Sequence, residues 1–184
     1  MFGHISISLK EVVEINRGKR LVRNQLTSTG NYPVYQNSMI PLGYYDKSNC
    51  KKNTTFVIAA GAAGEIGYCQ SDFWAADDCY YFDCKDNLIS KYLYYLLQSK
   101  KSYILSRVRK ASIPRISREV FENMLISVPT LQEQKRVVML LDCFDEICND
   151  LSVGIPAEIE ARKKQYEYYR DKLLAFNELK DEEI

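Results

Sequence analysis

The chain has 184 residues, of which 46% are hydrophobic and 27% charged, and its formal net charge is +1. This length suits one domain of ordinary size with an extension, and it is too short for two such domains. No apolar run approaches the roughly 18–20 residues that span a bilayer, and the first residues do not read as a secretion signal. We therefore expect a cytoplasmic protein.

The small net charge hides an asymmetry along the sequence. Residues 1–130 hold 17 Lys and Arg against 11 Asp and Glu, whereas residues 131–184 hold 8 against 13. Eleven of the 14 tyrosines also fall in the basic part. A basic module is the usual electrostatic footprint of a protein that docks on a polyanion, whereas an acidic helical region is better suited to joining protein to protein.

The basic part alternates short extended segments with turns, which predicts an α+β domain of mixed strands and helices. Its glycine-rich run predicts a hairpin between two strands, and a later segment changes to helical spacing of its leucines. In chain order the predicted elements are an apolar-periodic segment at 9–15, a basic turn at 17–20, irregular strands at 32–35 and 40–45, a buried strand at 55–60 joined through a turn to a second strand ending near 68, a strand at 79–82 and a helix at 89–99.

Nucleotide-binding and metal-binding motifs are weak in this sequence. The glycines of residues 61–67 lack the Gly-Lys-Ser/Thr ending of a P-loop, so a hairpin turn is the favoured interpretation. The six cysteines contain no CxxC pair, and the one histidine, His4, stands far from them. We predict neither a metal site nor a cofactor in this chain.

A catalytic alternative rests on a few carboxylates. Asp77, Asp78 and Asp83, together with Lys85, have the residue types of a metal-dependent nuclease. The favoured interpretation is that these are solvated charges at strand ends. The sequence therefore predicts no catalytic residue, and the nuclease remains an alternative that cleavage by the purified chain with metal would reveal.

Basic residues gather in three predicted turns, the last of which interleaves Lys and Arg with Tyr, Ser and Pro. Lys and Arg neutralise phosphates, Ser hydroxyls bond phosphate oxygens, and Arg can pair with guanine in the major groove. An ordinary solvated face is the alternative, but the basic balance of residues 1–130 favours nucleic acid. The predicted contacts are Arg17, Lys19 and Arg20 in the first turn, Lys51 and Lys52 in the second, and Arg107, Arg109, Lys110, Ser112 and Arg115 in the third.

The acidic part predicts a long helix that begins at residue 131. Thr130 and Glu133 have the spacing of a capping box, and apolar residues recur at 3- and 4-residue steps from 137 to 151. Such a wide apolar stripe predicts a packing partner.

A second helix is predicted at 157–176, after Gly154 and Pro156 interrupt the first. It would be about 30 Å long. Its heptad spacing defines a seam that predicts dimerisation. The seam residues are Ile159, Arg162, Tyr166, Tyr169, Leu173 and Phe176.

Several segments together resemble one known family. They are YPVYQNS, PLGYYD, AAGAAGEIGYC and ASIPRIS in the basic part, and VPTLQEQKRVVMLLDCFDEICNDL and GIPAEIEARKKQYEYYRDKLLAF in the helical part. The chain resembles the specificity subunit of type I restriction-modification systems over nearly its whole length. The resemblance implies a DNA target recognition domain at 1–130 and a helical spacer and dimerisation region at 131–177. The polar composition of residues 178–184 predicts a disordered tail.

The resemblance also implies a function without chemistry in this chain. The subunit would read double-stranded DNA and dock modification subunits that use S-adenosylmethionine and motor-nuclease subunits that use ATP and Mg. Family members usually carry two recognition domains and two spacer arms, whereas this chain has one of each. We therefore expect an antiparallel homodimer that reads a palindromic split target. The alternative is a truncated or scaffold fragment that binds partner subunits through its coil without DNA specificity of its own.

Overall fold

The computed structural model describes residues 5–145 and 164–165. The chain divides into two compact units, residues 1–139 and 140–184. In the second unit the described residues, 140–145 and 164–165, are helical. Among the described residues, no helix has the length and apolar character needed to cross a membrane. The α+β prediction is confirmed for the first unit, whose described residues form nine strands and several short helices.

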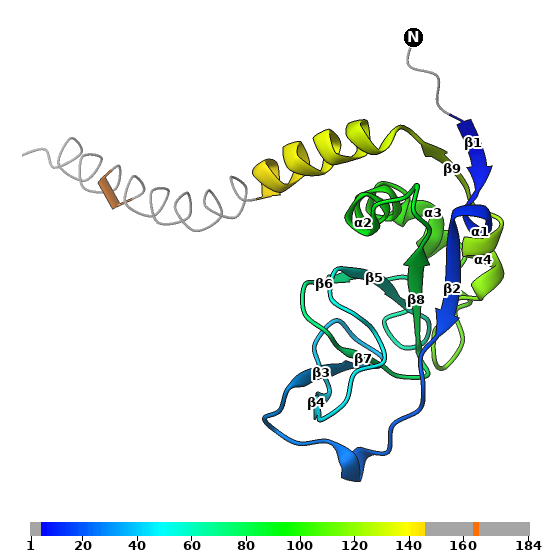
Figure 1. Ribbon diagram of the computed structural model, residues 1–184. Coiled ribbons are helices and arrows are strands. Elements are labelled where there is room, and N and C mark those ends of the chain that lie inside the picture. Colours follow the sequence, from blue (N-terminus) through cyan, green and yellow to red (C-terminus); the bar gives the residue numbers. More distant parts are fainter. Residues whose placement is uncertain (1–4, 146–163, 166–184) are drawn as a thin grey trace, which may run out of the picture. The chain divides into compact units, whose positions relative to one another are not determined.

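A four-stranded antiparallel sheet forms the centre of the first unit, in the order β2-β8-β5-β6 (Figure 1). Its strands are β2 (Val13–Arg17), β8 (Cys79–Cys84), β5 (Thr54–Ile58) and β6 (Ile66–Cys69). All five residues of the inner strand β5 are buried, because both faces of the sheet are covered. An inner strand with two covered faces is expected to lack polar alternation, as Thr-Thr-Phe-Val-Ile does.

The predicted glycine hairpin is confirmed. Strands β5 and β6 pair antiparallel, with Val57 opposite Ile66. Between them Gly61 and Gly64 have φ values of 87° and 89°. Residues with a Cβ atom are strained in this region of backbone conformation, whereas glycine is not. A Cβ atom on Gly61 would also lie 2.7 Å from the carbonyl oxygen of Asn37. Glycine is therefore required by the turn itself.

Two smaller sheets complete the strands. A three-stranded sheet has the order β4 (Gly43–Tyr45), β3 (Tyr32–Tyr35) and β7 (Trp74–Ala75), with β3 and β7 parallel. A two-stranded sheet pairs β1 (Ile5–Ser8) with β9 (Leu125–Val128). The predicted strand at 40–45 is thus shorter than expected, since only 43–45 pair with a neighbour.

Short helices cover one face of the central sheet. They are α1 (Leu9–Val12), α2 (Ser90–Ser99), α3 (Lys101–Ser106) and α4 (Arg118–Glu122), and a 3-10 turn, η1, lies at Arg23–Gln25. The predicted helix at 89–99 is confirmed by α2. The single apolar segment predicted at 9–15 is instead a one-turn helix followed by a strand, since α1 runs directly into β2.

The core lies on both faces of the central sheet. On the helical face Phe82 is 1% exposed and its ring centre lies 5.7 Å from that of Phe121 in α4. On the other face Phe56 and Phe73 pack together beneath β3, with ring centres 5.1 Å apart. The buried thiol of Cys50 belongs to this second cluster, and burial raises its pKa to about 12. This cysteine therefore acts as a small apolar side chain.

The predicted helix after residue 130 begins as expected. Residues 131–145 are helical, and Thr130 Oγ1 accepts a hydrogen bond of 3.4 Å from the backbone N–H of Glu133. Along this helix Leu140 and Phe144 are 47% and 61% exposed. The second predicted helix at 157–176 lies outside the described residues except for 164–165, and all six predicted dimerisation residues lie outside them: Ile159, Arg162, Tyr166, Tyr169, Leu173 and Phe176.

Candidate nucleic-acid interface

Two basic segments that lie about 90 residues apart in the sequence meet at one end of the central sheet. Arg17 is the last residue of β2, opposite Tyr80 at the start of β8. The loop after α3 returns to the same end, because Arg115 bridges to Ala60 just beyond β5. A hydrogen bond of 2.9 Å from the N–H of Ile116 to the carbonyl of Ala59 holds it there.

The loop from 109 to 115 has a closed base. The N–H of Arg109 donates to the carbonyl of Arg115 at 2.8 Å, and the N–H of Arg115 donates back at 3.2 Å. These backbone bonds do not depend on either side chain. Lys110 and Ser112 lie exposed in the loop between the two arginines, and Ile113 at its far side is 52% exposed.

The first basic turn is also fixed by backbone and side-chain contacts. The N–H of Gly18 donates to the carbonyl of Cys79 at 3.0 Å, and Trp74 Nε1 donates to the carbonyl of Lys19 at 2.9 Å. A Cβ atom on Gly18 would lie 2.1 Å from the carbonyl oxygen of Ala76, so only glycine fits this close approach. The turn that presents Arg17 and Lys19 is therefore a defined structure.

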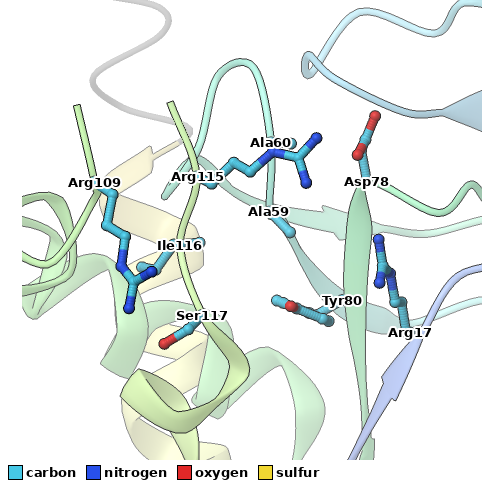
Figure 2. Close-up of a pocket in the computed structure, with 9 residues that line it drawn as sticks. All are labelled: Arg17, Ala59, Ala60, Asp78, Tyr80, Arg109, Arg115, Ile116 and Ser117. Atoms are coloured by element: carbon cyan, nitrogen blue, oxygen red, sulfur yellow. The ribbon is translucent and has the colours of Figure 1, made fainter. Parts of the chain in front are cut away.

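These segments surround a cavity of about 210 Å³ (Figure 2). Arg17 reaches it from β2, whereas Arg109 and Arg115 reach it from the two sides of the loop. Tyr80 lines it from β8, and Asp78 lines it from the position just before that strand. The remaining lining residues are Ala59, Ala60, Ile116 and Ser117.

A second cavity of about 470 Å³ shares Asp78 and Arg115 with the first. It adds Arg20 and Arg23 from the segment after β2. Its other lining residues are Leu21, Val22, Gln36 and Asp77. We call the two adjoining cavities the arginine hollow, which is lined by Arg17, Arg20, Arg23, Arg109, Arg115, Asp77 and Asp78.

The charged groups of the arginine hollow are mostly available to a ligand. Arg17 Nε donates to the backbone carbonyl of Asp77 at 2.8 Å, which orients that side chain. Within the described part of the chain, Arg109, Arg115 and Asp78 make no side-chain hydrogen bond or ion pair. Figure 2 shows Arg115 and Arg17 extending toward Asp78 from different elements. The hollow can therefore offer guanidinium donors and a carboxylate acceptor side by side.

The structure brings together only some of the predicted contact residues. Arg17, Arg20, Arg109 and Arg115 line the arginine hollow, and the exposed Lys19, Lys110 and Ser112 belong to the same two segments. The others do not line it. Arg107 lies 5.0 Å from the ring centre of Tyr103, and the N–H of Lys52, next to Lys51, donates to Asp72 at 2.7 Å in a separate turn.

Sequence reasoning missed several residues that line the two cavities. Arg23 and Gln36 belong to no recognisable motif, and the sequence pattern predicts Tyr80 only as a residue of a strand. Asp78 drew attention as a possible metal ligand, not as a neighbour of arginines. The acidic doublet Asp77-Asp78, within a part of the sequence rich in basic residues, was the one feature of the sequence that could have pointed to this site. The register of β2 with β8 that places the doublet near Arg17 is a long-range pairing.

The carboxylates of the nuclease alternative are held apart. Asp83 accepts a hydrogen bond of 2.8 Å from Asn16, and Lys85 Nζ donates to the carbonyl of Glu11 at 2.7 Å. Asp78 and Asp83 lie five positions apart along extended chain, a distance of about 16 Å. Among the described residues no three His, Cys, Asp or Glu side chains gather as metal ligands would.

Comparisons with known proteins identify the family. Residues 6–161 match the family described as the type I restriction modification DNA specificity domain. The chain is 31% identical over 171 residues to the MpnII specificity subunit of Mycoplasma pneumoniae, covering 90% of this chain and 51% of that one. A type I specificity subunit of Escherichia coli is 42% identical over 93 residues, covering 50% of this chain and 23% of that subunit.

Solved structures share the fold. A type I restriction-modification S subunit from M. genitalium superposes with a TM-score of 0.73 and 23% identity, covering 96% of this chain and 47% of that chain. The HsdS subunit of Thermoanaerobacter tengcongensis gives a TM-score of 0.65 at 18% identity, covering 82% of this chain and 39% of that one.

The chain therefore belongs to the type I restriction modification DNA specificity domain family. It contains a single target recognition domain. It spans 51% of the length of one Mycoplasma pneumoniae relative and 63% of another.

Proposed function

We propose that this chain recognises a DNA sequence as the specificity subunit of a type I restriction-modification complex, and that the arginine hollow is where it contacts the target. The observation that carries the proposal is the convergence of Arg17, Arg109 and Arg115 on one cavity from segments distant in the sequence. Guanidinium groups bind phosphate and pair with the O6 and N7 atoms of guanine. Membership of the DNA specificity family supports the same assignment.

Asp78 favours base reading over simple phosphate binding. A carboxylate repels the phosphate backbone, so its place between two arginines weakens any purely electrostatic site. A carboxylate can instead accept a hydrogen bond from the exocyclic amino group of cytosine in the major groove. Arg115 and Asp78 together present donor and acceptor chemistry that matches the two bases of a G·C pair.

The proposed subunit carries no chemistry of its own. Modification subunits would supply S-adenosylmethionine and adenine methylation, and motor-nuclease subunits would supply ATP hydrolysis and cleavage with Mg. The contribution of this chain is the choice of sequence and the geometry of assembly. The described residues that line the arginine hollow fit this role, because they are hydrogen-bonding and charged groups suited to base edges and phosphates.

We further propose that one chain reads half of a bipartite target and that two chains pair through the predicted second helix. A seam of about 30 Å is commensurate with half-sites one DNA turn, about 34–36 Å, apart. A twofold protein predicts a target that is an inverted repeat. Light scattering at several concentrations tests the pairing: a stable mass of twice 21.4 kDa supports it, and a concentration-independent monomer contradicts it.

The experiment for the function is protection in a reconstituted complex. The chain is combined with its modification subunit and DNA, and methylated positions are mapped with the wild type and with Arg115→Ala. Methylation at one defined sequence that the variant abolishes supports the proposal. Assembly of the complex without sequence-dependent methylation would contradict it and favour the scaffold alternative.

A further inference from the structure

Gln134 is the one fully buried side chain among the described helical residues 131–145, with an exposed fraction of 0%. Every hydrogen-bonding atom of its amide has a partner. Oε1 accepts from the N–H of Ile89 at 2.8 Å, and Nε2 donates to the carbonyls of Asn87 and Pro129 at 2.8 Å and 2.9 Å. All four residues belong to the first compact unit.

The three partners are backbone groups at two structural junctions. Asn87 and Ile89 flank the buried Leu88 in the turn that leads into α2, and Ile89 is the N-cap of that helix without a side-chain cap. Pro129 joins β9 to the helix that starts at residue 131. The Gln134 amide therefore ties the start of this helix to the start of α2. Without it, three backbone groups would lose a partner in hydrogen bonds that are partly buried.

Apolar packing at this helix start is comparatively weak. Leu131 is 43% exposed, and Val137 and Val138 are only half-buried. Apolar contacts are also non-directional, whereas three hydrogen bonds to fixed backbone groups define one orientation. A leucine or methionine would fill the same volume without fixing the helix in one direction.

We propose that Gln134 is a positioning residue that fixes the first turns of the spacer helix to the recognition domain in one orientation, and so sets the half-site separation that the protein accepts. This rests on the proposed function of the chain as a DNA specificity subunit. Each base pair added between half-sites changes their separation by about 3.4 Å and their rotation by about 35°. A helix start held by Gln134 transmits that constraint, whereas a loosened one tolerates several separations.

The test compares Gln134→Met with the matched control Gln132→Met, which alters an exposed glutamine of the same helical turn. Gln134→Glu is the second variant, because it keeps the side-chain length and the acceptor for Ile89 if the methionine variant fails to fold. The first readout is binding of DNA with half-sites at the preferred separation and with one base pair added or removed. Binding to a single half-site is measured alongside.

We expect Gln134→Met to keep single half-site affinity while its discrimination between separations falls about tenfold, the effect of losing buried hydrogen bonds. Gln132→Met should match the wild type. Unchanged discrimination in the Gln134 variants, with half-site binding intact, would overturn the inference.

The second readout does not require DNA. Hydrogen exchange of the free chain should show faster exchange of the Ile89 amide and of residues 131–138 in Gln134→Met, with no change in Gln132→Met. Exchange rates equal to the wild type would overturn the inference even if the chain bound no specific DNA. Absence of specific binding by the wild type with faster exchange in the variant would instead count against the proposed function alone, leaving the positioning role supported.

Discussion

Replacement of Arg109 and Arg115 by alanine should weaken DNA binding and reduce its dependence on salt. Both guanidinium groups line the arginine hollow, and neither makes a hydrogen bond or ion pair with another side chain among the described residues. The backbone bonds that close the 109–115 loop remain, since they do not involve the side chains. The double variant should therefore fold as the wild type does.

The size of the salt effect follows from counterion release. Each phosphate neutralised contributes about 0.9 to the slope of log affinity against log salt. Because Arg115 is assigned to a base and Arg109 to a phosphate, the double variant should lower the slope by about 0.9. Between 50 and 200 mM salt, the ratio of wild-type to variant affinity should then shrink by about 3.5-fold. Fluorescence anisotropy with a labelled duplex at several salt concentrations measures this directly.

The matched control removes two positive charges elsewhere. Lys10 in α1 and Lys135 in the helix after residue 130 are both exposed and lie outside the arginine hollow. The variant Lys10→Ala/Lys135→Ala should keep the wild-type slope. Equal slopes of log affinity against log salt for the wild type and the Arg109/Arg115 variant would refute the reasoning. An equal loss of slope in the lysine control would refute it as well.

Three further predictions follow from the described residues. Asp78→Asn removes a negative charge from the hollow, so affinity for unrelated DNA should rise about threefold while preference for the target falls. Competition binding with unrelated DNA measures this change, and a lower affinity for unrelated DNA would contradict the prediction. Phe82→Ala removes a ring that is 1% exposed and packs on Phe121, so urea unfolding should show a loss of about 3–5 kcal/mol, and a loss below 1 kcal/mol would contradict this packing. Burial raises the pKa of Cys50 and of Cys84 from 9.0 to about 12, so the neutral thiols stabilise the fold below pH 9 and the free energy of unfolding should fall as the pH rises from 9 toward 12. A Cys50→Ala variant should flatten that fall in urea titrations, and an unchanged pH dependence would contradict the role of this thiol.

Local patterns in the sequence were sufficient for the elements that depend on neighbouring residues. The hairpin of β5 and β6 follows from a buried run and two glycines that need positive φ values. Helix α2 follows from its leucine spacing, and the helix after residue 130 from its cap. The segment at 9–15 was misjudged because one apolar pattern fits both a helical turn and a strand.

The arginine hollow could be predicted only in part, because it depends on long-range pairing. The register of β2 with β8 places Arg17 near Asp78, and the bridge between Ala60 and Arg115 brings the later loop to the same end. Neither pairing has a local signal in the sequence. Gln134 was missed for a related reason, since a polar residue in the first turn of a helix reads as surface until its partners at Asn87 and Ile89 are known.

The central claim is that this chain selects a DNA sequence through the arginine hollow. The most direct measurement is selection from a library of random duplexes at 150 mM salt, with the purified chain alone and with its modification subunit, followed by sequencing of the recovered DNA. The account predicts one enriched motif that is lost with Arg115→Ala and kept with Lys10→Ala. A pool without enrichment in either selection, or the same motif recovered by Arg115→Ala, would contradict it.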